Sequence, residues 1–544
     1  MAGEAQGSEH RGDPLQGFAW WQRGVVYQVY PRSFQDSNGD GVGDLAGLRR
    51  RLDHLSWLGV DALWISPIYP SPMVDFGYDI ADYCNVDPLF GTLADFDGLV
   101  EDAHRRELRV ILDFVPNHTS NLHPWFMESC ASRTSAKRDW YLWRDPAPDG
   151  GPPNNWLSNF GGSAWELDTA TGQYYYHAFL KEQPDLNWRN AEVCAAMHDV
   201  LRFWLARGVD GFRVDVIWHL IKDDRFRDNP RNPAWQPGDA SFRRQLPIHS
   251  TDRPEVHDVI AGMRRVVEEF GDRVLIGEIY LPVERLVAYY GRDLSGVHLP
   301  FNFQLLEAAW NPQGLARLIE EYERLLPARG WPNWVLGNHD KQRIAARVGA
   351  EQARIAAMLL LTLRGSPTMY YGDEIGLAAV PIPPERTQDP WEKNEPGIGL
   401  GRDPARTPMQ WDAGVNAGFT TGSPWLPLSD DFVARNVATL ANDPHSILTL
   451  YRDLLALRRR HPALAIGSYT AVPSVADVLA YERRWDGERI FIALNFGRET
   501  CSVPSPTPAR SVLLSTHGDR VAGISSAPEI ELRPNEGIAL DLSA

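Results

Sequence analysis

Three carboxylates in this chain stand at the ends of short apolar runs: Asp215, Glu278 and Asp340. If these runs are parallel strands of one barrel, their carboxyl ends meet at a single rim. One strand-end acid is usually a structural hydrogen-bond acceptor, whereas three on one rim indicate a site. Two carboxyl groups facing one bond suit glycoside hydrolysis, because one protonates the leaving oxygen while the other acts from the opposite side.

The segment 211–218, GFRVDVIW, is predicted to be a buried strand that carries two charges. Alternate residues of a strand share a face, so Arg213 and Asp215 point the same way. Such a pair is either a structural ion pair inside the barrel or a catalytic acid with its charge partner. The polar residues at the other strand ends favour catalysis, and they include Asp113, Asn117, His118, Asn338 and His339.

The apolar runs alternate with segments of helical periodicity, for example 45–59, 93–106, 191–207 and 253–270. Alternating strands and helices imply a parallel sheet, and eight such units imply an α/β (β/α)8 barrel. The eight predicted strands are residues 25–30, 61–66, 109–115, 211–218, 273–279, 297–302, 333–338 and 367–372.

Two parts of the chain do not follow the barrel pattern. The long connection after the third strand is rich in Pro, Asn, Trp and Tyr, and we expect a small subdomain inserted there over the barrel mouth. The last part alternates apolar and polar residues between turns, which predicts an all-β sandwich. The expected division is a barrel over 1–115 and 191–465, an inserted subdomain over 116–190 and a C-terminal domain over 466–544.

The net charge of the protein limits the classes of partner that it is expected to bind. The 544 residues carry a formal charge of −17, which argues against nucleic acid and anionic membranes as partners. The 20 Trp, 18 Tyr and 20 Phe hint at a carbohydrate partner, because aromatic faces stack on sugar rings. Residues 1–14 are polar and no long apolar run occurs, so we expect neither a secretory signal nor a membrane span, and a cytoplasmic location.

Six motifs together resemble glycoside hydrolase family 13, the α-amylase family. Four of them look like the signature regions of that family: DFVPNH at 113–118, GFRVD at 211–215, GE at 277–278 and NHD at 338–340. QPDLN at 183–187 and RDPARTPMQW at 402–411 resemble the subgroup of oligo-1,6-glucosidases, α-glucosidases, trehalose synthases and sucrose isomerases.

The resemblance implies a retaining double displacement. Asp215 would be the nucleophile, with Arg213 keeping it ionised. Glu278 would be the acid that protonates the leaving oxygen and then the base that activates water or an acceptor. Asp340 would bind the hydroxyls at carbons 2 and 3 of the glucose.

The resemblance also assigns substrate-binding residues. His118 and His339 match donors to the same glucose, and Tyr78 matches a stacking platform. Asp75 and Arg402 match residues that close the end of the pocket, so the cleavage would be exo, on small α-glucosides. Phe160 and Phe179 are candidates for walls on the aglycone side.

The loop DSNGDGVGD at 36–44 is a second group of oxygen ligands. It begins like an EF-hand loop, but position twelve is Gly47 rather than Glu, so we reject an EF-hand. The subgroup resemblance implies a structural calcium or magnesium, away from the catalysis, and the alternative is a turn without metal. The ligands would be Asp36, Asn38, Asp40 and Asp44 with the carbonyl of Val42.

Several functions stay open within this family. An exo-α-glucosidase comes first, with possible transfer of glucose to alcohol or sugar acceptors. A dedicated transglucosylase or isomerase and an oligo-1,6-glucosidase are alternatives, whereas a non-catalytic relative would lack an acid. Among members of the subgroup, Val216 is typical of enzymes that accept α-1,6 bonds, whereas strict α-1,4 members often have Thr there. The continuation IWH, with the bulky Trp218 and His219 near the acceptor side, departs from both patterns. Maltose-type α-1,4 substrates are favoured, and α-1,6 stays open.

Overall fold

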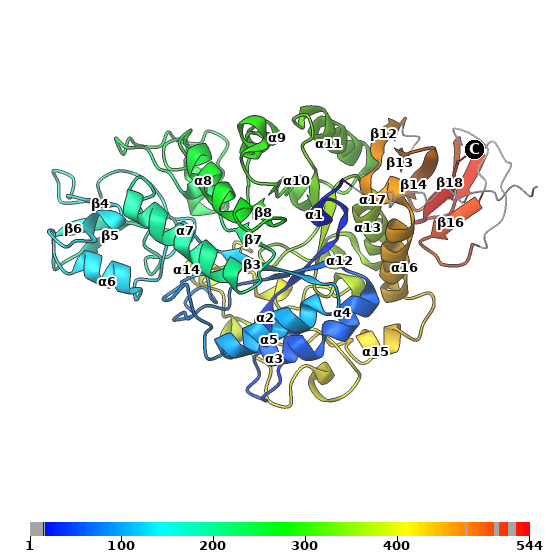
Figure 1. The fold of residues 1–544 in the computed structure, drawn as a ribbon, viewed down its shortest axis with the longest axis horizontal. Helices are drawn as coiled ribbons and strands as arrows, with labels where there is room; N and C mark the ends of the chain where they lie inside the picture. The colour runs from blue at the N-terminus through cyan, green and yellow to red at the C-terminus, as the bar shows by residue number, and fades with distance from the viewer. Residues whose placement is uncertain (1–14, 16, 474–476, 505–510, 521–528, 544) are drawn as a thin grey trace, which may run out of the picture.

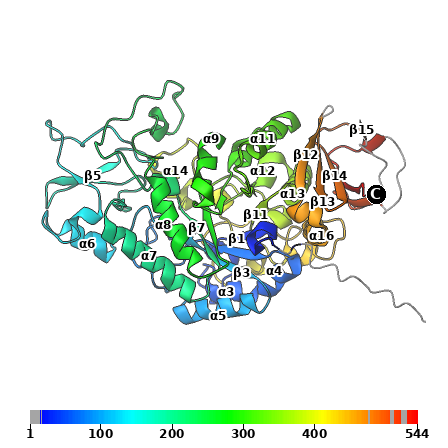
Figure 2. The same cartoon turned by 45° about the horizontal axis from the view of Figure 1, so that its top comes forward.

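The computed structural model describes residues 15, 17–473, 477–504, 511–520 and 529–543. Eight parallel strands form a nearly closed barrel, with neighbours in the order β10-β11-β1-β2-β3-β7-β8-β9, which confirms the predicted fold class. Helices surround the strands in Figure 1 and Figure 2. The strands are β1 (Val26–Val29), β2 (Ala62–Ile65), β3 (Arg109–Phe114), β7 (Gly211–Val214), β8 (Val274–Gly277), β9 (Leu299–Pro300), β10 (Asn333–Val335) and β11 (Ser366–Tyr370).

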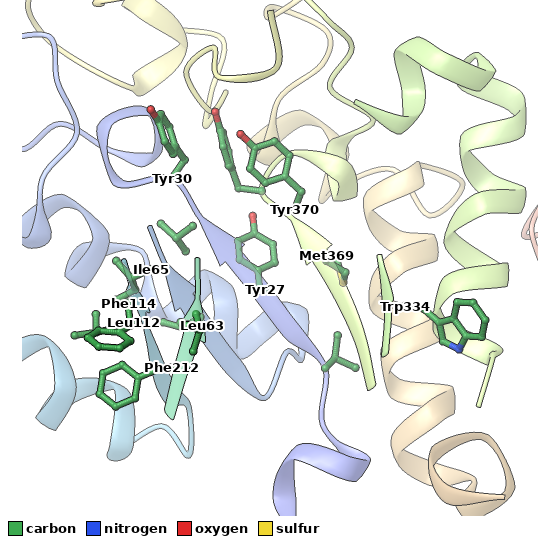
Figure 3. Close-up of a cluster of buried hydrophobic side chains, with 14 of the residues drawn as sticks. Tyr27, Tyr30, Leu63, Ile65, Leu112, Phe114, Phe212, Trp334, Met369 and Tyr370 are labelled. Carbon is green, nitrogen blue, oxygen red and sulfur yellow. The ribbon is translucent and has the colours of Figure 1, made fainter. Parts of the chain in front are cut away.

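Alternate residues of the barrel strands belong to two different hydrophobic clusters. Leu63, Leu112 and Phe212 belong to the large cluster that packs towards the helices, part of which Figure 3 shows. Their strand neighbours Trp64 and Ile111 belong to a second cluster, which also takes in residues of β1, β8, β9 and β10. The period-two alternation of the strands therefore leaves one set of positions facing the inside of the barrel.

The helices agree with the predicted segments except at one break. The segment predicted as a single helix over 45–59 is divided at Arg51 into two helices, and Gly59 ends the second with φ 99°. A left-handed residue at this position is easiest for glycine, as the sequence indicated. The main helices around the barrel are α3 (Leu45–Arg50), α4 (Leu52–Leu58), α5 (Leu93–His104), α7 (Ala191–Ala206), α8 (Val256–Glu268), α11 (Pro312–Leu325), α13 (Ala350–Thr362) and α16 (Ile447–Arg460).

The connection between β3 and α7 has a small core of its own. It carries α6 (Pro124–Cys130) and an antiparallel sheet of β4 (Trp143–Arg144), β6 (Gln173–Tyr176) and β5 (Trp165–Asp168). Aromatic side chains such as Trp156, Trp165 and Tyr176 form its hydrophobic cluster. It projects from one end of the barrel, at the left of Figure 1.

The C-terminal part is a pair of antiparallel sheets, as predicted. Five strands pair in the order β12-β13-β14-β18-β16, and β15 pairs with β17. Side chains of both sheets, among them Phe491, Val503 and Leu532, share one hydrophobic cluster. The strands are β12 (Ser468–Val472), β13 (Val478–Trp485), β14 (Glu488–Asn495), β15 (Cys501–Pro504), β16 (Ser511–Ser515), β17 (Glu529–Leu532) and β18 (Gly537–Asp541).

The sequence predicts neither a membrane span nor a secretory signal. Among the helices of the described residues, none is long and apolar enough to cross a bilayer. The polar segment over residues 1–14, on which the absence of a secretory signal was predicted, lies outside the described residues.

The buried guanidinium of Arg458 on α16 ties the end of the barrel to the chain that leads into the C-terminal sheets. It donates hydrogen bonds to the carbonyls of Leu361 (3.0 Å) and Leu363 (3.3 Å), at the C-terminal end of α13. It also donates to the carbonyls of Leu464 (2.9 Å) and Ala465 (3.3 Å), just before β12. A buried carbonyl without a partner is costly, so this one side chain stabilises several loop ends at once.

We predict that Arg458→Met lowers the free energy of unfolding by about 3 kcal/mol or more, because it leaves these carbonyls buried and unpaired. Thermal and urea unfolding followed by circular dichroism measure this. The control is Arg460→Met on the same helix, since Arg460 is exposed and, among the described residues, its side chain hydrogen-bonds only the carbonyl of Ala456, at 3.3 Å. Equal stability of the two variants would contradict the anchoring role.

Candidate active site

A pocket of about 440 Å³ lies at the carboxyl ends of the barrel strands. Asp215, Glu278 and Asp340, the three predicted strand-end acids, all line it. The inserted subdomain contributes Phe160 and Phe179 to the same pocket. Acids from three strands and aromatic rings from the insertion therefore enclose one space.

The fully buried guanidinium of Arg213 on β7 lies beneath this pocket. Its Nη1 donates to Asp113 Oδ1 at 2.7 Å and to Asp215 Oδ1 at 2.8 Å. Its Nη2 lies 2.7 Å from Glu278 Oε2. Arg213 is thus shared among three carboxylates, rather than reserved for Asp215 as the sequence suggested.

The chain turns sharply directly after Asp215. The strand prediction over 211–218 is wrong beyond Val214, because Val216 has φ 37° and a short 3-10 helix, Ile217–His219, follows. A left-handed conformation is strained for a β-branched residue, and such strain concentrates at functional sites. Here it directs the Val216 N–H to Glu278 Oε2, at 2.8 Å.

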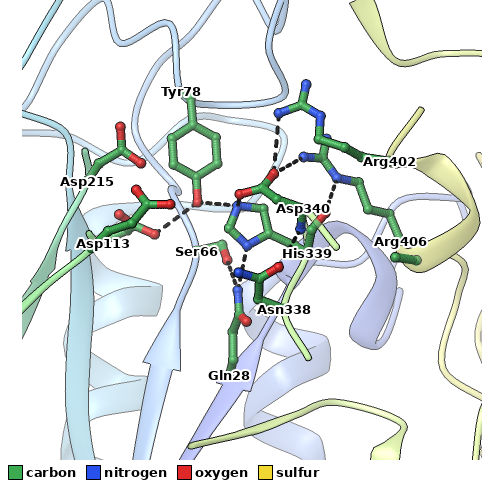
Figure 4. Close-up of polar contacts among 12 residues, drawn as sticks. Gln28, Ser66, Tyr78, Asp113, Asp215, Asn338, His339, Asp340, Arg402 and Arg406 are labelled. Carbon is green, nitrogen blue, oxygen red and sulfur yellow. Dashed lines mark hydrogen bonds and ion pairs between the residues drawn. The ribbon is translucent and has the colours of Figure 1, made fainter. Parts of the chain in front are cut away.

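A second group of contacts surrounds Asp340 and is drawn in Figure 4. His339 Nε2 lies 3.2 Å from Asp340 Oδ2 and 2.7 Å from the Tyr78 hydroxyl. The other ring nitrogen of His339 lies 2.7 Å from Gln28 Nε2. Tyr78 also donates to Asp113 Oδ2 at 3.0 Å, so hydrogen bonds and ion pairs connect the Asp340 group to the Arg213 group.

Arg402 closes one end of the pocket through ion pairs. Its Nη2 contacts Asp75 Oδ1 at 2.7 Å and Asp389 Oδ1 at 2.6 Å, and its Nη1 lies 3.3 Å from Asp340 Oδ1. Gln183 Nε2 donates to the other oxygen of Asp75 at 3.2 Å. Asp75 and Arg402, which the resemblance assigns to the closed end of the pocket, therefore contact each other directly.

The carboxyl groups around Arg213 and the carboxyl group of Asp340 differ in how strongly they hold a proton. Burial raises the pKa of Asp215 and of Glu278, and the charge of Arg213 opposes this only in part. Burial also disfavours the charged form of Asp340, but His339, Arg402 and Arg406 outweigh it and lower the pKa of Asp340. One guanidinium cannot balance three buried carboxylates, so the Arg213 group retains a proton, whereas Asp340 is ionised.

The structure brings every predicted substrate-binding residue to this pocket. Asp75, Tyr78, His118, His339 and Arg402 line it with Phe160 and Phe179, and Arg213 lies beneath. The ring of Phe179 lies 5.3 Å from that of His118, and Phe160 lies 6.0 Å from Phe179, measured between ring centroids.

Sequence analysis missed several residues that hold the site together. Asp389 pairs with Arg402, and Arg406 Nη2 donates to Asp340 Oδ1 at 2.9 Å. Arg406 falls in the quoted motif over 402–411 and could have been singled out there, whereas no pattern in the sequence marks Asp389. Asp113 was noted at a strand end but was given no role.

A buried lysine joins the inserted subdomain to the barrel. Lys222 Nζ lies 2.5 Å from Asp185 Oδ2 and donates to Asn117 Oδ1 at 2.8 Å. Asp185 belongs to the QPDLN motif and Asn117 to the DFVPNH motif, so two of the six motifs meet at a structural contact beside the pocket. Burial lowers the pKa of Lys222, while Asp185 favours the charged form.

The predicted cation loop lies before α3, and its residues do not line the pocket. Asp36 accepts hydrogen bonds from the N–H groups of Asn38, Gly39 and Gly41, and Asp44 caps α3 by accepting from Gly47 N at 2.7 Å. Among the described residues, the one group of three potential metal-binding side chains close enough to share an ion is elsewhere, at His517, Asp519 and Glu536. Arg520 and Arg533 already neutralise the two carboxylates of that group.

Comparison with known proteins decides the family. The family model described as "Alpha amylase, catalytic domain" matches residues 28–467. The chain belongs to the α-amylase family, glycoside hydrolase family 13. A second model, a domain of unknown function (DUF3459), matches residues 466–534.

Similar proteins place the chain in the α-glucosidase and oligo-1,6-glucosidase subgroup. A probable α-glucosidase of Rhizobium meliloti (strain 1021) is 43% identical over 503 residues, which are 90% of this chain and 91% of the relative. An oligo-1,6-glucosidase of Heyndrickxia coagulans is 38% identical over 540 residues, 92% of this chain and 96% of the relative. The predicted enzyme class, a glycoside hydrolase, is therefore confirmed.

Two solved structures that are similar to this chain are named as a transfer enzyme and as a synthase. An α-glucosyl transfer enzyme matches with a TM-score of 0.91 and 40% identity, over 96% of this chain and 99% of that one. A trehalulose synthase matches with a TM-score of 0.88 and 36% identity, over 96% of this chain and 100% of that one. This fold is therefore shared with a protein named as a transfer enzyme and with one named as a synthase.

Proposed function

We propose that this protein is a retaining, exo-acting α-glucosidase that removes the non-reducing terminal glucose from short α-glucosides. The observation that carries this proposal is the direct ion pair of Asp75 and Arg402 at 2.7 Å, which closes one end of the pocket beside Asp340. If both bind the outer hydroxyls of the terminal glucose, no further sugar fits beyond it, so the site is a pocket rather than a through-going cleft.

The acids support a double displacement. Asp215 attacks the anomeric carbon and forms a β-glucosyl-enzyme, while the carboxyl group of Glu278 gives its proton to the leaving oxygen. Glu278 then takes a proton from water, which attacks the same carbon and releases glucose with Asp215 restored. Both carboxylates contact terminal nitrogens of one guanidinium, a closeness that suits retention better than the wide spacing of inverting enzymes.

The substrate-binding residues act on the same glucose in this proposal. Ionised Asp340 binds the hydroxyls at carbons 2 and 3, and those contacts strengthen as the ring flattens towards an oxocarbenium ion. His118 and His339 donate to the glucose, Tyr78 stacks against it, and Phe160 and Phe179 form walls towards the aglycone.

Transfer of the glucosyl group is the second candidate, and the similarity to an α-glucosyl transfer enzyme and a trehalulose synthase favours it. An alcohol or sugar would then replace water as the group that Glu278 activates. Maltose-type α-1,4 bonds are proposed ahead of α-1,6 bonds as the substrate linkage.

We also propose the division into a barrel over 1–115 and 191–465, an insertion over 116–190 and a C-terminal domain over 466–544. The two family models support the last boundary, because they meet at residues 466–467.

A product time course on maltose, isomaltose, sucrose and trehalose, with and without an added alcohol, tests this function. We expect glucose from maltose as the main product, with minor transfer to the alcohol. Isomaltose cleavage ahead of maltose would make the enzyme an oligo-1,6-glucosidase, and an isomer of sucrose as the main product would make it an isomerase. No reaction on any of the four would contradict the proposed class of substrate.

Asp215→Asn and Glu278→Gln are each expected to lower kcat by several orders of magnitude with unchanged unfolding, because each removes a reacting group and keeps its shape. The assay is hydrolysis of an aryl α-glucoside, with circular dichroism as the check of folding. Near-normal hydrolysis by either variant would refute the role assigned to that residue.

The charge of Asp113 is expected to set the pH range of activity. Activity requires Asp215 ionised and Glu278 protonated, and the negative charge of Asp113 raises the pKa of both groups. Asp113→Asn removes that charge and frees Arg213 for the other two carboxylates, so both limbs of the kcat/KM profile move to lower pH, by about one pH unit. Asp210→Asn is the control, a buried acid at the opposite end of β7, and it leaves the limbs in place. A shift to higher pH would contradict the sharing of Arg213.

We propose that the loop over 36–44 holds a structural calcium or magnesium. The support is its all-oxygen donor set, three carboxylates, one amide and the Val42 carbonyl, which suits a hard divalent cation. Since the loop lies away from the pocket, chelation by EDTA is expected to lower Tm by a few degrees with little change in kcat at 25 °C. Elemental analysis of the purified protein and a melting series with added Ca²⁺ or Mg²⁺ check this. Neither a bound ion nor a shift in Tm with either ion would refute the site.

A further inference from the structure

His219 is a buried histidine in the pocket wall with an unpaired ring. It is 5% exposed, it lines the pocket, and it ends the short turn that follows Asp215. Its Nδ1 is buried and has no hydrogen-bond partner among the residues that the structure describes. Its ring packs against Phe179 at 5.3 Å and Trp218 at 4.8 Å between centroids. Buried polar atoms are almost always paired, so an unpaired imidazole beside a pocket needs a reason.

The ring of His219 is neutral and presents a donor to the pocket. Burial lowers the pKa of His219 well below its ordinary value, and the nearby Lys222 and His118 add to this. A neutral imidazole has one N–H and one lone pair. An orphaned acceptor is tolerated better than an orphaned donor, so the buried Nδ1 carries the lone pair. The N–H is therefore on Nε2, the nitrogen left to face the pocket.

The turn that carries His219 also holds the proposed acid. The backbone N–H of His219 donates to the Val216 carbonyl at 2.9 Å, and the Val216 N–H donates to Glu278 Oε2 at 2.8 Å. Its neighbour Trp218 lies 5.8 Å from Tyr280, two residues after Glu278, between ring centroids. His219 thus belongs to the turn that contacts the carboxyl group proposed to protonate the leaving oxygen.

We propose that His219 is a specificity-determining residue whose Nε2–H donates a hydrogen bond to a hydroxyl of the group bonded to the glucose. The enzyme would then prefer sugar or polyol leaving groups over leaving groups without hydroxyls. Acceptors enter where the leaving group departs, so the same preference applies to transfer. This proposal rests on the proposed α-glucosidase function, and it specifies which class of leaving group the active site prefers.

The test compares maltose with phenyl α-glucoside, whose leaving group has no further hydroxyl. His219→Phe keeps a ring in the wall but removes the donor, so the ratio of kcat/KM for maltose to that for phenyl α-glucoside is expected to fall about tenfold, as for the loss of one hydrogen bond. His219→Gln keeps a donor and is expected to recover most of the ratio. Because both rates come from one preparation, any loss of folded protein cancels.

His198→Phe on α7 is the matched control, and its ratio is expected to stay at the wild-type value. Within the described part of the chain, His198 Nε2 is also buried without a hydrogen-bond partner, but it lies outside the pocket. An unchanged ratio in His219→Phe overturns the inference, whether both rates stay or both fall, because His219 then does not distinguish leaving groups. A wild-type enzyme that hydrolyses neither substrate overturns the proposed function and this inference together.

Discussion

The active site depends on one buried guanidinium shared by three carboxylates. Burying an arginine is costly unless its charge is balanced, and Arg213 is balanced by acids from three adjacent strands. The barrel register makes this possible, because Asp113 is directly opposite Arg213, while Val214 is opposite Gly277, the residue before Glu278. A slip of one residue in either pairing would turn these side chains to the helix side. The hydrophobic alternation of the strands therefore also determines that the charged side chains point into the barrel.

The second charged group is built from loops and has the opposite balance. Asp340 meets two arginines, Arg402 and Arg406, and Asp389 on a distant loop holds Arg402 in place. Its carboxylate is therefore ionised near pH 7, whereas the acids around Arg213 compete for one positive charge, and burial raises the pKa of Asp215 and Glu278. A fixed charge suits binding and a shared proton suits proton transfer, so the two groups can serve different tasks in one pocket.

The sequence predicted the features that depend on periodic patterns or on residues close together in the chain. Strands, most helices and the acids at strand ends could be located because apolar alternation and parallel topology fix where each strand ends. The break at Arg51 and the turn at Val216 could not, because both depend on tertiary packing and not on residue propensity. Asp389 was missed for a related reason: its partner lies 13 positions away on an irregular loop, and no spacing rule connects them.

The pKa values of the pocket histidines bear on which groups in the pocket change charge near neutral pH. Burial lowers the pKa of His118 to about 4 and those of His219 and His339 well below the ordinary value, so all three are neutral near pH 7. Neutral imidazoles can orient hydroxyls as donors without adding charge to the site. The pocket groups whose pKa values burial shifts upward, towards the range of an ordinary histidine, are carboxyl groups: Asp215, Glu278 and Asp75. The charges that change during the proposed reaction therefore belong to carboxyl groups that share Arg213, while its guanidinium stays positive.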